Sequence, residues 1–172
     1  MKIAFVRHGE TDFNKHGKVT GQTDVSLNEE GIRQAEEMTT EVEAVFDVIF
    51  SSSAKRALET SAIINKKLRV PIVANALILE RAFGSLQGKT WDEIGSEVRK
   101  ADKEQRYDYR SFGGESAEDV RKRLMDFVAE VKQSGYARPL VVCHGGIIRM
   151  LHHLHQKEFG HIENASVHEF DL

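Results

Sequence analysis

The chain has 172 residues, 40% of them hydrophobic and 30% charged, which is typical of one globular domain and excludes a disordered or collagen-like chain. Its 24 basic and 27 acidic residues give a net charge of −3, so no overall positive field would attract nucleic acid. The single cysteine excludes an internal disulfide, and no apolar run reaches the roughly 20 residues of a membrane span. We therefore expect one cytoplasmic domain over residues 1–172, with neither nucleic acid nor a membrane as partner.

Predicted strands and helices alternate along the chain. A short apolar run at 2–6 predicts the first buried strand, and Asn28 can then cap a helix whose apolar positions step by three or four. These positions are Ile32, Ala35, Met38, Val42 and Phe46. A second strand is predicted at 47–50, and Ser53 can cap the helix that follows it. The positions of this helix expected to face inward are Ala57, Leu58, Ser61, Ile64 and Leu68.

Two further apolar runs, at 71–73 and 77–79, predict two more strands. Ser116 and Asp119 have the spacing of a capping box, ahead of a helix with Val120, Leu124, Phe127 and Val131 facing inward. The last predicted strand covers 139–143. This alternation predicts an α/β fold with a mostly parallel sheet covered on both faces. Because such sheets bind ligands beyond the carboxyl ends of their strands, functional residues are expected directly after the strands.

Charged and nucleophilic side chains do follow the predicted strands. Arg7 and His8 come after the first strand, and Arg56 falls in the first turn of the helix after the second. Glu80 follows the run at 77–79, and His144 follows the run at 139–143. Since the carboxyl ends of parallel strands share one edge of a sheet, we expect these five residues to converge.

The five residues together suit a phosphate monoester as substrate. Arg7 and Arg56 can bind the phosphoryl oxygens as bidentate forks and stabilise the charge that builds during transfer. A neutral His8 can attack phosphorus and hold the phosphoryl group covalently. His144 would donate a further hydrogen bond, and Glu80, if protonated, could give a proton to the leaving oxygen. This chemistry needs no metal and no cofactor.

Six segments resemble the histidine phosphatase superfamily, also called the phosphoglycerate mutase-like superfamily, nearly from end to end. They are VRHGETDFN, VTGQTDVSLNEEG, SSSAKRALETS, LERAFGSLQG, FGGESAEDVRKR and VVCHGGIIR. Their order and spacing carry the resemblance. It implies a three-layer α/β/α sandwich with a mixed six-stranded sheet. The 172-residue form resembles the short phosphatases of the superfamily more than its longer mutases.

The resemblance also implies roles for single residues. His8 would be phosphorylated, and Arg7 and Asn14 would contact the phosphate. Thr20 and Gly21 fall in the segment that resembles the substrate loop, and Arg81 matches an arginine that helps to hold a substrate carboxylate. We therefore expect a metal-independent phosphomonoesterase that acts on small phosphorylated metabolites through a phosphohistidine. Its substrate depends on the rim of the pocket, at 18, 20–23, 81–83 and 96–114, and the sequence makes no prediction of the oligomeric state.

Three alternative functions are also compatible with the sequence. A cofactor-dependent phosphoglycerate mutase would return the phosphoryl group to its substrate, after priming by a bisphosphorylated sugar acid. A phosphate-binding module would keep the arginines without a competent nucleophile or acid. A cysteine phosphatase would use Cys143, which has the C-x5-R spacing to Arg149. Val142 stands where such enzymes have histidine, and apolar Ile147 and Ile148 indicate a packed helix, so we expect Cys143 to be buried and inert.

A short histidine tract near the end of the chain, His152, His153 and His155, raises the question of a metal site. His152 and His155 share a helical face, but no cysteine or carboxylate completes a four-ligand set with familiar spacing. A solvated helix end is the interpretation that we favour, and no metal is expected.

Overall fold

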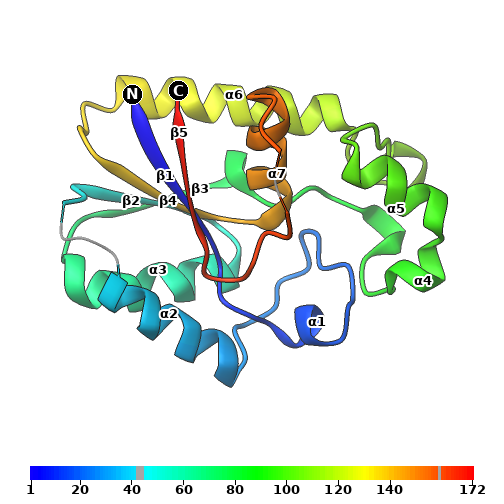
Figure 1. Ribbon diagram of the computed structural model, residues 1–172, viewed down its shortest axis with the longest axis horizontal. Helices are drawn as coiled ribbons and strands as arrows, with labels where there is room; N and C mark the ends of the chain where they lie inside the picture. Colours follow the sequence, from blue (N-terminus) through cyan, green and yellow to red (C-terminus); the bar gives the residue numbers. More distant parts are fainter. Residues whose placement is uncertain (42–44, 159) are drawn as a thin grey trace.

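The computed structural model describes residues 1–41, 45–158 and 160–172. Within these ranges five strands form one sheet in the order β3-β2-β4-β1-β5 (Figure 1). The strands are β1 (Lys2–Arg7), β2 (Val48–Ser52), β3 (Ile72–Asn75), β4 (Pro139–Cys143) and β5 (Val167–Asp171). The first four are parallel, and β5 pairs antiparallel with β1 at one edge. The mixed sheet is as expected, with one strand fewer than the resemblance implied.

Helices cover both faces of the sheet and give three layers (Figure 1). On one face lie α2 (Glu29–Glu41) and α3 (Lys55–Leu68), and on the other α6 (Ala117–Gln133) and α7 (Gly145–Leu154). Beyond the carboxyl ends of the parallel strands lie α1 (Asp12–Lys15), α4 (Trp91–Ile94) and α5 (Ser96–Lys103). Three short 3-10 helices are η1 (Ala76–Ile78), η2 (Gly84–Leu86) and η3 (Arg110–Phe112). Of the helices described, none has the length and apolar character needed to cross a membrane.

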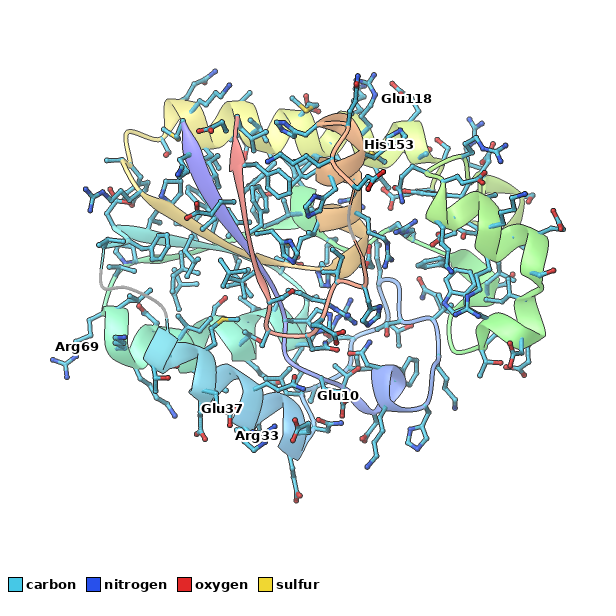
Figure 2. All side chains as sticks on the ribbon, in the orientation of Figure 1. Glu10, Arg33, Glu37, Arg69, Glu118 and His153 are labelled. Atoms are coloured by element: carbon cyan, nitrogen blue, oxygen red, sulfur yellow. The ribbon has the colours of Figure 1, made fainter. Side chains whose placement is uncertain are left out.

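The alternation of side chains along the strands divides the core between the two faces. In β1, Ile3 and Phe5 pack into the core under α6 and α7, whereas Ala4 and Val6 pack into the core under α2 and α3. The outer side of α2 is charged, with the Arg33 and Glu37 side chains pointing into solvent (Figure 2). Helix α6 begins with the predicted capping box and buries its four predicted inward positions.

The predicted strand at 77–79 is wrong. The segment forms η1 instead, because the Asn75 side chain accepts a hydrogen bond from the Leu77 N–H at 2.8 Å and turns the chain out of β3. Ile78 is still buried, so the apolar run reports burial without distinguishing a strand from a tight helical turn. The antiparallel strand β5 was not predicted, since its polar His168, Glu169 and Asp171 break up the apolar pattern.

The helix predictions need three corrections. Ser53 does not cap α3: Ala54 takes the N-cap position, and the Asp24 carboxylate accepts the Lys55 N–H at 3.0 Å. Ile32 and Leu58 are exposed by 42% and 36%, because each helix contacts the rest of the fold over a narrower face than its apolar stripe. Helix α2 is described only to Glu41, with Phe46 beyond it packed against the core, and Val42 lies outside the described residues.

Candidate active site

A polar cavity of about 390 Å³ lies at the carboxyl ends of the parallel strands, where function was expected. It is lined by Arg7, His8, Glu10, Asn14, Gly17, Lys18, Val19, Thr20, Gly21, Arg56, Glu80, Phe83, Trp91, Arg99, Gly145, Arg149, His161, Glu163 and Asn164. A larger and more apolar cavity of about 620 Å³ lies beside Lys2 and Pro139, the first residues of β1 and β4. It contains none of the predicted site residues, so the chemistry belongs to the polar cavity.

His8 enters this cavity as a neutral imidazole of defined tautomer. Its backbone N–H donates to the Cys143 carbonyl at 3.0 Å, which ties the end of β1 to the end of β4. Because the Gly9 carbonyl can only accept, the ring Nδ1 at 2.7 Å from it carries the proton, which leaves the lone pair on Nε2. Burial, followed by the charge of Arg56, lowers the pKa of His8 well below its usual value. The ring therefore presents an unprotonated Nε2 near neutral pH.

A close backbone approach positions the loop that carries His8. A Cβ on Gly9 would lie 2.3 Å from the Gly31 carbonyl oxygen, and a Cβ on Gly31 would lie 2.0 Å from the Glu10 carbonyl oxygen. Neither distance is possible for a real side chain, so both positions require glycine. This contact holds the loop after β1 against the first turn of α2.

Arg56 joins the two predicted active-site histidines. Its Nε donates to His8 Nε2 at 3.1 Å and its Nη2 lies 3.1 Å from His144 Nδ1. An arginine donates only, so the His144 proton is on Nε2, which donates to the Ser52 hydroxyl at 2.7 Å. The remaining Arg56 donors reach the carbonyls of Gly21 and Thr23. Burial lowers the pKa of Arg56 to about 10 and that of His144 well below its usual value, so the first stays charged and the second neutral.

The Arg7 side chain has a buried hydrogen-bond donor that is unpaired among the described residues. Its Nη1 donates to the Ile162 carbonyl, but its Nε is buried without a hydrogen-bond partner among the described residues. Burial, with the charge of Arg149 next, lowers the pKa of Arg7 to about 10, so the guanidinium is charged at neutral pH. The cavity thus holds two arginines and a neutral imidazole in mutual reach, as predicted.

Glu80 is ionised in this arrangement. One carboxylate oxygen accepts the Arg81 N–H at 2.8 Å, and the other accepts the Gly146 N–H at 2.9 Å. Burial raises the pKa, but Arg81, Arg149 and the two backbone donors outweigh it and lower the pKa of Glu80 to about 2. A Cβ on Gly146 would lie 2.1 Å from a Glu80 oxygen, so only glycine lets the carboxylate rest on the start of α7. Glu80 is therefore ionised near neutral pH, and an acid role would require it to gain a proton first.

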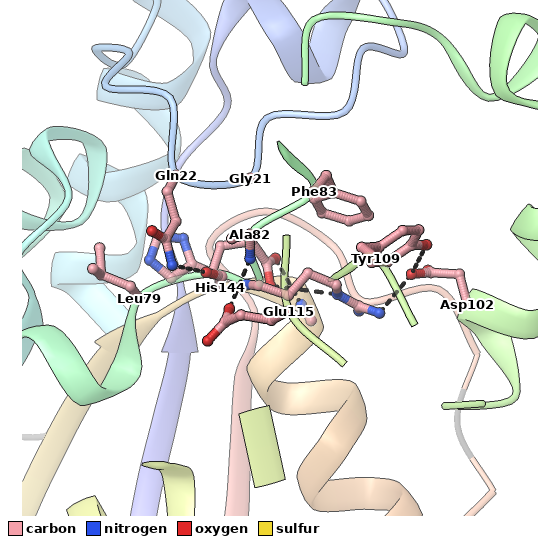
Figure 3. A network of polar contacts seen from close by, with 12 residues as sticks. Gly21, Gln22, Leu79, Ala82, Phe83, Asp102, Tyr109, Glu115 and His144 are labelled. Carbon is pink, nitrogen blue, oxygen red and sulfur yellow. Dashed lines mark hydrogen bonds and ion pairs between the residues drawn. The ribbon is translucent and has the colours of Figure 1, made fainter. Parts of the chain in front are cut away.

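Arg81 does not line the polar cavity, although a substrate contact was predicted for it. Its side chain is fully buried, and Nη1 donates to the Asp102 carboxylate at 2.6 Å. Asp102 also accepts the Tyr109 hydroxyl at 2.8 Å, and the Arg81 guanidinium lies over the Tyr107 ring at 4.5 Å. Figure 3 shows Asp102 and Tyr109 paired on one side of this network and His144 on the other. Asp102 thus holds the guanidinium inside the protein, with its Nε 3.7 Å from the Glu80 carboxylate.

The other predicted binding residues do line the cavity. Asn14 belongs to the capping box of α1 and receives a hydrogen bond from Asn164 at 3.3 Å. Gly21 presents its carbonyl to Arg56, and the Thr20 hydroxyl is buried with no hydrogen-bond partner among the described residues. Of the rim segment expected at 20–23, Thr20 and Gly21 line the cavity, and their contact with a ligand stays a prediction.

Sequence reasoning missed several lining residues. Arg149 was considered only for the cysteine phosphatase alternative and Arg99 only as part of the rim at 96–114, whereas Trp91 and Asn164 were given no role, yet all four border the cavity. A signal existed for Arg149, since it lies five residues after His144 in a helix that starts at the site. Asn164 donates to the His8 carbonyl at 3.0 Å from a segment with no recognisable pattern, so nothing in the sequence pointed to it.

The side chain of Cys143 and the histidine tract do not line the polar cavity. Cys143 is fully buried in the core, and burial raises the pKa of its thiol well above its usual value, which leaves no thiolate to attack phosphorus. His152 meets His168 at 3.1 Å between α7 and β5. Across the described ranges, no three His, Cys, Asp or Glu side chains gather where they could hold a metal ion.

Comparisons with known proteins show which proteins this chain is similar to. Residues 3–172 match the family model described as the histidine phosphatase superfamily, branch 1. A probable phosphatase of Schizosaccharomyces pombe is 37% identical over 92% of this chain and 76% of its own, and a metal-independent phosphoserine phosphatase of Arabidopsis thaliana is 35% identical over 99% and 76%. A mycobacterial glucosyl-3-phosphoglycerate phosphatase structure superposes with a TM-score of 0.86 at 28% identity, covering 98% of this chain and 91% of that one.

Proposed function

The chain belongs to the histidine phosphatase superfamily and is a phosphatase, and from this premise we propose that it hydrolyses small phosphomonoesters through a phosphohistidine on His8. The observation that carries the proposal is the His8 tautomer. The Gly9 carbonyl keeps the proton on Nδ1, so that the Nε2 lone pair faces a cavity bordered by Arg7 and Arg56. A nucleophile and two oxyanion-binding groups thus occupy one cavity.

The first step forms an N–P bond and breaks the ester P–O bond. Arg56 donates to His8 Nε2 in the absence of a ligand, so this hydrogen bond must give way when a phosphoryl group binds. The phosphoryl oxygens would then accept from Arg56 and from the unused Nε of Arg7. The leaving oxygen takes a proton and departs as the alcohol. Water then attacks phosphorus, the N–P bond breaks, and inorganic phosphate leaves His8 neutral again.

The proton for the leaving oxygen would pass through Glu80. The carboxylate lies on the start of α7 beside the cavity, and its pKa of about 2 means that it holds no proton before the substrate arrives. A phosphomonoester has a second pKa of about 6, so its monoanion brings one proton into the site. An ester monoanion beside ionised Glu80 holds the same number of protons as an ester dianion beside protonated Glu80. In the second arrangement the Glu80 carboxyl can donate its proton to the leaving oxygen.

A trapping experiment tests the proposal. The protein is mixed briefly with a labelled phosphomonoester and quenched in base, where a phosphohistidine survives. We expect labelled protein from the unmodified chain and from Cys143→Ala, and none from His8→Ala. Label retained by His8→Ala but lost in Cys143→Ala would contradict the proposal. Following the label in solution separates hydrolysis from the mutase alternative, which would return it to another hydroxyl of the substrate instead of releasing phosphate.

A further inference from the structure

The segment FGGESAEDVRKR, at 112–123, has no role in the steps above. It covers the loop before α6 and the first two turns of that helix. Its Arg123 and Glu115 form a bidentate ion pair, in which Arg123 Nε and Nη2 donate to the two carboxylate oxygens at 2.8 and 3.0 Å. The two side chains are 15% and 21% exposed, and neither is among the described residues that line the polar cavity. The other contacts of this pair are all with the protein chain.

The Arg123 guanidinium binds the segment that carries Glu80. Its Nη1 donates to the carbonyls of Leu77 and Leu79, each at 2.7 Å. Its Nη2 donates to the Glu80 carbonyl at 3.3 Å. Together with the two hydrogen bonds to Glu115, these contacts use all five N–H donors of the guanidinium. One side chain of α6 therefore holds three carbonyls of the chain that leads up to the proposed acid.

Glu115 binds the same segment on the other side of Glu80. Its Oε2 accepts the Ala82 N–H at 2.8 Å, and its own backbone N–H donates to the Ala82 carbonyl at 2.9 Å (Figure 3). A Cβ on Gly114 would lie 2.3 Å from that carbonyl oxygen, so only glycine lets the two loops approach this closely. The chain on both sides of the proposed acid is thus held by one ion pair.

The segment around Glu80 depends on such contacts because it has no regular structure of its own. The chain between the end of η1 at Ile78 and the start of η2 at Gly84 belongs to no helix or strand. The Glu80 carboxylate accepts from the Gly146 N–H of α7 and from the Arg81 N–H of this same irregular segment. The path of the segment therefore decides where the carboxylate lies relative to His8.

We propose that Arg123 and Glu115 are positioning residues that hold the Glu80 carboxyl within reach of the leaving oxygen. The inference rests on the proposed function and deepens its proton-transfer step. The pair touches no substrate and acts through Glu80. A pair that only stabilises the fold would affect all substrates alike. A positioning pair affects mainly those esters whose leaving group needs a proton.

The test compares the single-turnover rate constants for phosphorylation of His8 by ethyl phosphate and by p-nitrophenyl phosphate. Their ratio does not depend on how much of a preparation is folded. In Arg123→Lys the ratio of ethyl to p-nitrophenyl phosphate should fall by about 10- to 100-fold, the effect of a small displacement of a catalytic group. An ammonium keeps the charge but cannot make the five contacts of the guanidinium. Glu115→Gln should lower the ratio less, because its amide N–H₂ replaces one of two accepting oxygens.

The matched control is Arg121→Lys, since Arg121 forms the same kind of fork with Glu118 on the exposed side of α6. It should leave the ratio unchanged. A double variant shows whether Arg123 acts through Glu80: once Glu80→Gln has removed the acid, adding Arg123→Lys should lower the ratio no further. If a thermal melt shows that Arg123→Lys does not fold, Glu115→Gln alone and combined with Glu80→Gln decides.

Three results would overturn the positioning role and leave the proposed function standing. They are an unchanged ratio in the folded variants of Arg123 and Glu115, an equal fall in Arg121→Lys, and a further tenfold fall in the Glu80→Gln background. An unchanged ratio in Glu80→Gln itself would remove the proton step and this inference together. The phosphohistidine is tested separately, by the label trapped on His8.

Discussion

The polar cavity has two sides that are built differently. The nucleophile side is lined by Arg7, His8 and Arg56, with His144 held against Arg56, and these residues come from strand ends and the first turn of α3. The acid side centres on Glu80, Arg81 and Asp102, which come from the irregular chain after β3 and from α5. Burial keeps the imidazoles of the first side neutral, whereas Arg81, Arg149 and two backbone N–H groups keep Glu80 of the second side charged. One cavity therefore holds the proposed nucleophile, His8, in its neutral form beside the proposed acid, Glu80, in its ionised form.

The largest effect is expected from Glu80→Gln on substrates with poor leaving groups. An alkoxide needs a proton as the P–O bond breaks, and a general acid contributes about 10²- to 10⁴-fold. Single-turnover phosphorylation of His8 by an alkyl phosphate should slow by that factor, and phosphorylation by p-nitrophenyl phosphate should slow far less. Equal losses on the two substrates would leave Glu80 as a structural partner of Arg81 only.

Asp102→Asn should test whether ion pairing holds the acid side together. Arg81 and Asp102 are 0% and 4% exposed, so the substitution removes the nearest counter-charge of a buried guanidinium and leaves Glu80, 3.7 Å away, as the next carboxylate. Breaking such a pair costs about 3–5 kcal/mol of unfolding free energy, measured by urea denaturation. Asp108→Asn is the matched control, because it removes an acid from the exposed pair with Arg110 and should change little. A similar loss in both variants would show that burial of the pair is not the cause.

The pH dependence of kcat/KM should separate the two sides in activity. Because Glu80 is ionised in the free enzyme, the needed proton comes with the ester monoanion. Above the ester's second pKa of about 6, the monoanion falls tenfold per pH unit, and kcat/KM for alkyl phosphates should fall with it. p-Nitrophenyl phosphate, which needs no acid, should show a flatter profile. A parallel decline for both esters would mean that the limiting ionisation lies on the nucleophile side.

The smallest effect concerns stability, where the two sides should respond in different pH ranges. In the folded chain the pKa values of His8 and His144 lie well below their usual value of 6.5. Below pH 6.5 these two histidines therefore bind protons in the unfolded chain that they do not bind in the folded chain. The free energy of unfolding should therefore decrease as the pH is lowered below about 6.5, by about 1.4 kcal/mol per pH unit for each histidine. Glu80, lowered from 4.5 to about 2, adds stability that is lost only as pH falls through that lower range.

Urea denaturation at pH 5, 6 and 7 measures the first range. His8→Asn should reduce the slope of the free energy of unfolding against pH by the contribution of one histidine. Glu80→Gln should leave this slope unchanged. A slope in His8→Asn equal to that of the unmodified chain would mean that His8 is protonated in the folded protein.

The same contrast explains what could be predicted from the sequence. His8 and His144 were predicted because each follows a continuous apolar strand, and the end of a parallel strand specifies where the next residue lies. Glu80 was predicted at the site although the segment before it forms the 3-10 helix η1 and not a strand. The apolar run still indicated that this segment is buried. Arg81 was assigned to substrate because the resemblance implied that role, and its partner, Asp102, lies 21 residues away with no pattern linking the two. Pairing of buried charges is a tertiary property and leaves no local periodicity.

The pairing of β5 with β1 brings the first and last described residues together: the Met1 amine donates to the Leu172 carbonyl at 2.8 Å. Both lie at the end of the sheet away from the polar cavity (Figure 1). A short linker could therefore join them, with new ends opened at the exposed turn around Gly135. In such a circular permutant β4, α7, β5 and β1 would follow one another in the chain. The cavity would keep its geometry while the order of His8 and His144 along the chain is reversed.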